Sequence, residues 1–424
     1  MRGLRRWWDG TAGGLPATFW YLWAGLLVNR AGAFAVLFLS LYLTEARGAS
    51  EALAGAVVGA YGAGGAVGVL LAGVLADRWG RRSTLVAAHL AAAGLMVGLA
   101  FSQHLALIAA LAALVGVAHS MPSPAFVAAI VDVVPEHRRS RAFNLQFWAF
   151  NLGMAVASLL AGLLAEASFL ALFLVDAAAT LAAAALIAWK VPETLPRRRS
   201  ERAGNHLDPT HAGRSRRPGL HTALTDRTFL VFVGLTFVLA VLTMQTSTIM
   251  PLAMRADGLS PSAYGMVVAL GGALIVVGQL FVPGLIDGRR AHRVLALSTG
   301  LLAVGFGALA LADHLWGYLS AAVVWTVGSM LAAPPNAQIN ADLAPPELRA
   351  RYQSVFYLTF PAASFVAPTL GGVSLQYLGE RHWLVVAALG LLAAGCHLLA
   401  GPSRERRVAA RRVGEPARTS QPVA

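Results

Sequence analysis

The stretch Gly73-Val-Leu-Ala-Asp77-Arg78-Trp-Gly80-Arg81-Arg82 places four charges and two glycines within ten residues. Residues 52–76, which include its first four positions, and residues 84–102 after it contain no Asp, Glu, Lys or Arg. A helix needs about 20 mostly apolar residues to cross the hydrocarbon core of a bilayer. The stretch therefore predicts a short charged turn between two membrane-spanning helices.

The same alternation of apolar runs and short polar connections continues outward in both directions along the chain. It predicts an all-α membrane protein with twelve transmembrane helices, numbered here as spans 1 to 12. The spans lie near residues 18–43, 52–76, 84–102, 104–131, 142–165, 168–190, 227–250, 262–286, 293–312, 314–337, 352–376 and 381–401.

The composition agrees with a chain that is solvated mainly by lipid. Only 12% of its 424 residues are charged and 57% are hydrophobic, whereas soluble domains carry about 25% charged residues. The net charge of +13 does not indicate a nucleic-acid partner, because the arginines lie between long apolar runs. Cys396 is the single cysteine, which excludes an intramolecular disulfide and a cysteine-pair metal site. No metal or cofactor is expected.

The distribution of basic residues predicts the orientation in the membrane. The termini and the 2–3, 4–5, 6–7, 8–9 and 10–11 loops hold 29 of the 33 basic residues, and the other side holds only Arg47, Arg255 and Arg381. Cytoplasmic loops are enriched in Lys and Arg, so both termini are expected in the cytoplasm. The Ala- and Arg-rich composition, in which Lys190 is the only lysine, indicates a bacterial inner-membrane protein.

An internal repeat divides the chain into two halves. With an offset of 210 residues, rare residue types fall on one another at matching positions of the predicted topology. The pairs are Asp77 with Asp287, His104 with His314, Pro124 with Pro334, Asp132 with Asp342, Pro135 with Pro345 and Arg139 with Arg349. The predicted units are two parallel six-helix halves, 1–190 and 227–401. The linker 191–226 and the tail 402–424 are poor in apolar residues and are expected to be disordered.

The charged turn is similar to the signature G-x-L-x-D-R-x-G-R-R of the Major Facilitator Superfamily. The family's 4–5 loop pattern D-x-x-P-x-x-x-R recurs at Asp132–Arg139 and at Asp342–Arg349. The resemblance implies that Asp77, Arg81 and Asp132 lock the halves in the outward-facing state; the alternative is that these charges only set the topology. The full gating set predicted here is Gly73, Asp77, Arg78, Gly80, Arg81, Arg82, Asp132, Asp287 and Asp342.

Span 1 carries Asn29-Arg30-Ala-Gly32 and resembles the first span of the multidrug-exporter branch, the drug–proton antiporters. Span 5 matches the antiporter signature G-x-x-x-G-P-x-x-G-G only in its small residues, because its proline and two of its glycines are missing. Span 4 lacks the arginine that many drug–proton antiporters carry. These two departures weaken the case for antiport.

Three ionisable residues inside predicted spans are proton-coupling candidates. Arg30 and Asp176 lie near the middle of spans 1 and 6, and His119 lies in span 4. Ionisable residues at this depth are costly and commonly mark ion or substrate pathways. The alternative for Asp176 is a structural role, in which its carboxylate bonds backbone or hydroxyl groups.

The family fold implies that spans 1, 4, 7 and 10 line a central cavity, and span 5 adds further polar residues. Each of these residues alone is more often interhelical packing than a ligand contact. The cavity candidates are Asn29, Arg30, Ser120, Asn144, Asn151, Gln245, Asn336, Gln338 and Asn340.

The sequence features above bear on four candidate functions. The leading prediction is a secondary transporter that acts as a monomer and exports drug-like amphipathic compounds in exchange for protons. The first alternative is an importer or uniporter of a polar metabolite such as a sugar, amino acid or peptide. A membrane enzyme lacks any supporting motif, and a sensor or scaffold would need a folded domain outside the membrane.

Overall fold

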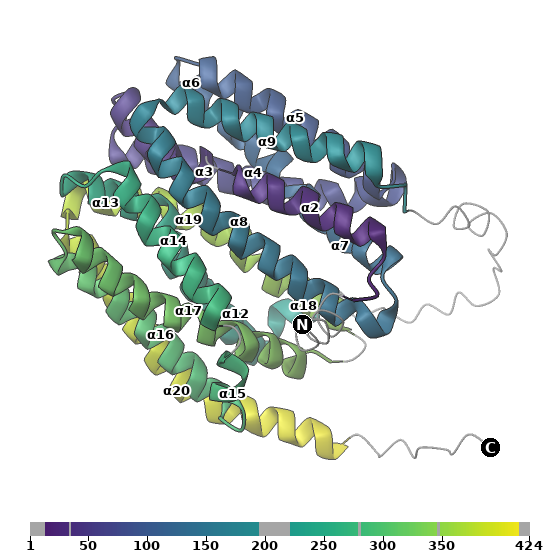
Figure 1. Cartoon of the computed structure of the whole chain (residues 1–424). Helices are drawn as coiled ribbons and strands as arrows, with labels where there is room; N and C mark the ends of the chain where they lie inside the picture. Colours follow the sequence, from purple (N-terminus) through teal and green to yellow (C-terminus); the bar gives the residue numbers. More distant parts are fainter. Residues whose placement is uncertain (1–12, 34, 195–220, 279–280, 346–347, 415–424) are drawn as a thin grey trace, which may run out of the picture.

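The structure is a computed structural model that describes residues 13–33, 35–194, 221–278, 281–345 and 348–414. Twelve helical segments in this part of the chain are long and apolar enough to cross a membrane. The predicted number of spans and the all-α fold class are thereby confirmed. Figure 1 shows the helices of the first half (purple to teal) and of the second half (green to yellow) as two adjacent groups.

The first half forms spans 1 to 6, and span 1 consists of several consecutive pieces. Its helices are α2 (Ala17–Ala31), α3 (Ala35–Leu41) with a π-helical turn (Tyr42–Ala46), α4 (Glu51–Arg78), α5 (Arg81–Phe101), α6 (Leu105–Ser120), α7 (Pro122–Val133), α8 (Arg139–Ala167) and α9 (Phe169–Lys190).

The second half forms spans 7 to 12. Its helices are α11 (His221–Thr225), α12 (Arg227–Thr248), α13 (Met250–Ala256), α14 (Pro261–Gly278), α15 (Val282–Ile286), α16 (Ala291–Gly307), a 3₁₀ turn (Ala308–Leu311), α17 (Leu315–Leu343), α18 (Arg349–Tyr357), α19 (Thr359–Leu378) and α20 (Arg381–Gly414).

Breaks within spans follow from local sequence. Span 1 is interrupted at Gly32, span 4 at Met121 before Pro122, and span 7 at Ile249 before Pro251. Proline has no N–H and its ring clashes with the preceding turn. This explains the break of span 4 before Pro122. Span 10, by contrast, runs as one helix through Pro334 and Pro335.

Helix α20 extends well beyond its predicted end near residue 401. The prediction of a disordered tail from residue 402 is therefore wrong for residues 402–414. Alanine and arginine, which dominate this segment, have high helix propensity. An ion pair between Arg407 and Asp226, at the N-terminus of α12, also holds the extension against the bundle. Residues 195–220 and 415–424, which were expected to be disordered as well, lie outside the described residues.

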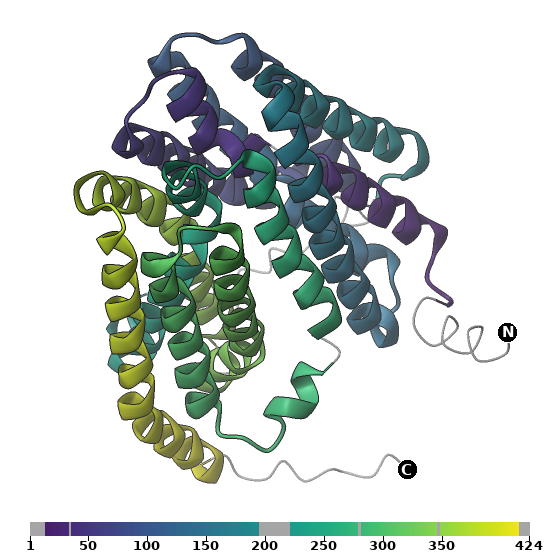
Figure 2. The same cartoon turned by 60° about the vertical axis from the view of Figure 1, so that its left-hand side comes forward.

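The halves meet along two pairs of helices, α4 with α19 and α8 with α14. Glycine makes both contacts possible. A Cβ on Gly55 would lie 2.2 Å from the backbone oxygen of Pro368, and one on Gly265 would lie 2.3 Å from that of Ser158. Small residues permit such close approach between membrane helices. The second view of the bundle shows α14 lying along the first half (Figure 2).

Three polar contacts join the halves at the end of the bundle that holds the 1–2, 5–6, 7–8 and 11–12 connections. We call this end the loop end, and the end that bears both chain termini the termini end. Arg255 pairs with Glu45 at 2.7 Å. The amide of Ala52 donates to Gln376 at 3.1 Å, and the amide of Ser262 donates to Glu166 at 3.2 Å. The structure is thus closed at the loop end.

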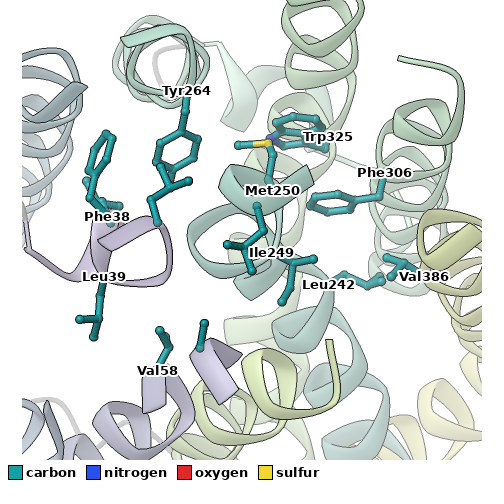
Figure 3. Packing of buried hydrophobic residues seen from close by; sticks show 14 of the residues in the cluster. Phe38, Leu39, Val58, Leu242, Ile249, Met250, Tyr264, Phe306, Trp325 and Val386 are labelled. Atoms are coloured by element: carbon teal, nitrogen blue, oxygen red, sulfur yellow. The ribbon is translucent and has the colours of Figure 1, made fainter. Parts of the chain in front are cut away.

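Aromatic side chains fill the space behind this closure. Phe38 of the first half contacts Tyr264 of the second half edge-on, with 5.2 Å between ring centroids. Phe306 stacks on Trp325 at 5.1 Å. Figure 3 shows Phe38 beside Tyr264, and Met250 beside Trp325. The buried core is therefore continuous across the boundary between the halves.

Candidate functional site

Arg30 lies in the last turn of α2, just before the break at Gly32. Its backbone packs against α8, where a Cβ on Gly153 would come within 2.5 Å of the Arg30 Cβ. The guanidinium lies 4.5 Å from the centroid of the Phe150 ring, a favourable cation–π distance. Its Nε is buried and has no hydrogen-bond partner. The arginine is thus a fixed charge with unused donor capacity.

A chain of hydrogen bonds connects span 1 with Asp176 of span 6. Asn29 donates to the hydroxyl of Thr180 at 3.2 Å, and that hydroxyl donates to Asp176 at 3.4 Å. Asp176 is only 1% exposed and lies within electrostatic reach of Arg30. The structure therefore brings together two of the three predicted proton-coupling residues, although they are separated by 146 positions (176 minus 30) in sequence.

His119, the third candidate, forms a second part of the same cluster. Its Nδ1 lies 3.4 Å from the hydroxyl of Tyr61, and its Nε2 is buried without a partner. His89 lies on α5, with its Nδ1 2.6 Å from the backbone oxygen of Leu85, and borders the same small hollow as Arg30. Five polar or charged groups, drawn from spans 1, 2, 3, 4 and 6, thus meet inside the first half.

Sequence reasoning missed Tyr61, His89, Thr180 and Phe150. His89 carried a usable signal, because it is a polar residue in an otherwise apolar span. The other three residue types are common in any span, and only the packing of the helices brings them to Arg30, Asp176 and His119.

Two hollows adjoin the cluster. A small one of about 70 Å³ is bordered by Asn29, Arg30, His89, Gln146 and Phe150, among others. A larger one of about 210 Å³ lies between the halves and is bordered on the first side by Phe150, Asn151 and Met154. Phe150 borders both. The wall of the larger hollow that belongs to the second half includes Thr243, Met250, Val267, Phe306, Trp325 and Thr326.

The remaining cavity candidates do not all lie at these hollows. Gln245, Asn336 and Asn340 are buried in the second half. Asn336 accepts a hydrogen bond from Thr236 at 3.2 Å, whereas Gln245 Oε1 and Asn340 Oδ1 have no partner. Asn151 is the member of the predicted set that borders the larger hollow.

Three predicted cavity residues lie elsewhere. Ser120 packs against α4, where a Cβ on Gly65 would lie 2.8 Å from its hydroxyl. Asn144 is exposed. Gln338 is also exposed and borders a separate hollow at the termini end of the second half. The structure therefore does not place these three at the site. A polar residue on a span identifies depth in the membrane but not which way the helix faces.

The charged turn forms a compact network centred on Arg81, which is 8% exposed. Its guanidinium donates to Asp77 at 3.1 Å, to Asp132 at 3.1 Å and to the backbone oxygen of Ala76 at 2.6 Å. The sequence analysis predicted that Asp77, Arg81 and Asp132 act together. In this state, with the loop end closed, the side-chain contacts among these three residues lie entirely within the first half.

Glu193, which sequence reasoning missed, completes this network. Its carboxylate accepts from the amide of Arg81 at 2.7 Å and from the amides of Arg82 and Ser83 at 3.4 Å each. It thus caps the N-terminus of α5, where negative charge is stabilising. Gly80 allows this arrangement, since its φ of +102° suits glycine and a Cβ there would collide with Glu193.

The other gating candidates are less engaged. Arg82 donates to the backbone oxygen of Ala188, and Arg78 is exposed. A Cβ on Gly73 would meet nothing within 4 Å, so no helix packs closely against this glycine in this state. Asp287 accepts from the amide of its neighbour Gly288 at 3.0 Å. Asp342 lies at the separate hollow of the termini end.

Comparisons with known proteins agree with this architecture. The sequence matches the profile of the Major Facilitator Superfamily over residues 22–368 and 235–421. The uncharacterized MFS-type transporter YhjO of Bacillus subtilis is 28% identical over 378 residues, covering 88% of this chain and 90% of that protein. Multidrug resistance protein MdtH of Klebsiella pneumoniae is 25% identical over 333 residues, covering 76% and 79% respectively.

Solved structures show the same fold. The crystal structure of peptide transporter POT in complex with sulfate superposes with a TM-score of 0.74 at 16% identity, covering 93% of this chain and 96% of that one. The chain is therefore a member of the Major Facilitator Superfamily, a multi-pass membrane transporter of small solutes and not an enzyme.

Proposed function

We propose that this protein exports amphipathic, drug-like compounds in exchange for protons. The observation that carries the proposal is the position of Phe150. One side of its ring borders the hollow between the halves, and Arg30 lies over the ring within electrostatic reach of Asp176. Phe150 and Arg30 thereby lie between a cargo in the hollow and the Asp176 carboxylate, which we propose as the proton-binding group.

The lining of the larger hollow favours an amphipathic cargo. Aromatic, methionine and aliphatic side chains and two glycines form most of its wall, and one amide and four hydroxyl groups lie among them. Binding sites for organic molecules are typically apolar, with a small number of polar groups that fix orientation. Methionine adapts to ligands of different shape, which agrees with a broad substrate range. The relative MdtH is named a multidrug resistance protein.

The electrostatic logic of coupling follows from the fixed charge of Arg30. Arginine stays protonated in proteins, so its positive charge is balanced when Asp176 is ionised and unbalanced when Asp176 binds a proton. Protonation therefore changes the electrostatic free energy of Arg30 and of the Phe150 ring beneath it. We infer that this change alters the affinity of the adjoining hollow and the preference between alternating states.

Proteoliposomes that contain a pH-sensitive dye test the proposal. Lipophilic cations, sugars and amino acids are added in turn, and proton flux is compared between wild type and Asp176→Asn. The matched control is Asp313→Asn, an exposed aspartate in the 9–10 loop. We expect a lipophilic compound to drive proton flux in wild type and in the control. Asp176→Asn should abolish that flux while retaining exchange of labelled for unlabelled substrate, because exchange moves no net proton.

Other results would contradict parts of the proposal. Proton flux in Asp176→Asn equal to wild type removes that residue from coupling. Loss of both flux and exchange, with intact protein by size-exclusion chromatography, assigns Asp176 to binding or structure instead.

The second candidate is an importer or uniporter of a polar metabolite. It is favoured by the buried oxygens of Gln245 and Asn340, which have no hydrogen-bond partner in the structure. Unpaired buried polar atoms are costly. Neither residue borders the hollow between the halves in this state, so a hydroxyl- or amine-bearing solute would reach these oxygens only in the other alternating state. In the proteoliposome experiment a proton-coupled importer predicts proton flux with sugars or amino acids and none with lipophilic cations, whereas a uniporter predicts no proton flux with any compound.

A further inference from the structure

A hollow of about 540 Å³ opens at the termini end of the second half, between the ends of α16, α17 and α20. It is separate from the hollow between the halves, and the transport mechanism proposed above does not use it. The residues that matter for its chemistry are Arg289, Arg290, His292, Asp342, Arg404 and Glu405.

The internal repeat explains why this space exists. In the first half Arg81 fills the corresponding place, bonded to Asp132 and to a backbone oxygen. An offset of 210 residues places Ala291 at the position of Arg81, and Asp342 at that of Asp132. Both Ala291 and Asp342 border the hollow. Because the alanine side chain ends at Cβ, the space that a guanidinium occupies in the first half stays open in the second.

Arg404 forms part of the wall and is only 4% exposed. Its Nη2 donates to the backbone oxygen of His397 at 3.1 Å, but its Nε and Nη1 have no hydrogen-bond partner. Those two nitrogens carry three N–H donors on a permanently charged group. A buried charge with unused donors is costly unless an acceptor binds it. The natural complement is an anion with several oxygen atoms.

Two carboxylates also border the hollow, and neither accepts a hydrogen bond from Nε or Nη1 of Arg404. Glu405 is bonded to Nδ1 of His292 at 2.6 Å, and Asp342 takes part in an interaction of its own. Arg289 and Arg290 are exposed at the rim and add positive charge. The N-terminus of α16, at Ala291, brings backbone amides to the same wall, and such amides favour bound phosphate.

The position of the hollow indicates which anion binds. Helix α20 borders the hollow with residues between Gly401 and Ala409, and just before Gly401 the side chains of Leu398 and Leu399 are 51% and 82% exposed. Exposed leucines at that point suit contact with acyl chains, with the hollow at the level of lipid headgroups. Basic pockets between helix ends on the cytoplasmic side bind anionic headgroups. We propose that this hollow binds the phosphate of an anionic phospholipid, with Arg404 as its principal contact.

The experiment measures thermal unfolding of the purified full-length protein in detergent, titrated with short-chain phosphatidylglycerol. Inorganic phosphate and short-chain phosphatidylcholine are titrated in parallel. The test variant is Arg404→Gln, and the matched control is Arg406→Gln, an exposed arginine on the same helix. We expect phosphatidylglycerol to raise the unfolding temperature of wild type and of the control, and Arg404→Gln to bind it at least about tenfold more weakly.

A second variant keeps the test meaningful if Arg404→Gln fails to fold. Ala291→Phe fills the hollow and leaves every charge in place, and it should weaken phosphatidylglycerol binding as well. Wild-type affinity in both variants would overturn the site. Equal stabilisation by phosphatidylcholine would overturn the requirement for net negative charge. Stabilisation by inorganic phosphate at the same concentrations would overturn the lipid assignment in favour of a soluble phosphate.

Discussion

At the scale of single residues, Arg30 illustrates how packing gives a charge its function. Its guanidinium lies over Phe150, and its Nε is buried without a partner. An arginine inside a membrane span is costly to insert. A close carboxylate and an aromatic face reduce that cost, and both are present here because α2, α8 and α9 pack against one another. The Arg30 charge is therefore held in place by three helices that are distant from one another in the sequence.

Substitution of Arg30 tests this arrangement directly. Arg30→Gln removes the charge and should lower the rate of substrate exchange by at least about tenfold, since a charge-assisted contact contributes roughly 1.5–3 kcal/mol. Arg30→Lys keeps the charge but not the planar guanidinium, and should fall between Arg30→Gln and wild type. Exchange of labelled substrate in proteoliposomes measures both. Wild-type exchange in Arg30→Gln would show that the residue has a structural role only.

At the scale of elements, the junction of α11, α12, α18 and α20 depends on one carboxylate. Asp226 accepts from the amide of Phe229 at 3.1 Å, which caps α12, and from the hydroxyl of Tyr352 at 2.8 Å. It also pairs with Arg407 on the extended end of α20. Four helices thus meet at a residue that a sequence reading places in a linker. The contact explains why α20 continues past the membrane as an ordered helix.

The stability of this junction should depend on pH. Burial alone would raise the pKa of the Asp226 carboxyl, but hydrogen bonds from Arg407, Phe229 and Tyr352 outweigh it and hold that pKa below its usual value. A lowered folded-state pKa stabilises the fold above the unfolded-state pKa of about 3.9 and loses that contribution as the pH falls through the folded-state value.

Asp226→Asn should therefore lower the unfolding temperature by about 2 °C near neutral pH, where loss of this half-buried ion pair and its hydrogen bonds costs roughly 2 kcal/mol. The difference from wild type should shrink steadily below about pH 4. Differential scanning fluorimetry across this range measures it. A difference that does not change with pH would mean that the ionised form of Asp226 contributes nothing.

At the scale of the whole molecule, two six-helix bodies share a narrow seam of glycines. On α4, a Cβ at Gly55 would strike the backbone of Pro368 in the other half. Nine residues further on, a Cβ at Gly64 would strike the backbone of Ala113 within the same half, at 1.9 Å. The first contact belongs to the closed loop end and the second to the body of the first half. One helix therefore serves both an interface between the halves and an interface within the first half.

Replacing a glycine of α4 by alanine should therefore have different effects at the contact between the halves and at the contact within the first half. Gly55→Ala should leave the unfolding temperature nearly unchanged and open the loop end, because only one state uses that contact. Gly64→Ala should lower the unfolding temperature, because steric overlap within a packed body costs about 1–3 kcal/mol. Distances between spin labels at the loop end, together with thermal unfolding, separate the two.

Gly73→Ala is the matched control on the same helix, since a Cβ there meets nothing in this state. Its stability and its loop-end distances should equal those of wild type. Identical behaviour of Gly55→Ala and Gly64→Ala would show that the two halves do not move as separate bodies along this seam.

The sequence alone determined the number of spans, the repeat of two halves and the family resemblance. These properties depend on the length of apolar runs and on motifs within a few residues, because a helix in lipid must satisfy its own backbone. The sequence also indicated Arg30, Asp176 and His119 as candidate functional residues, since ionisable residues inside a span are rare.

Only the tertiary structure decided which of these residues share a site. The contact of Phe150 with Arg30, the cap that Glu193 places on α5, and the open space left by Ala291 all depend on distances between helices far apart in sequence. Those distances follow from close packing at small residues, which a pattern along one helix does not contain. The continuation of α20 depends on Asp226 for the same reason.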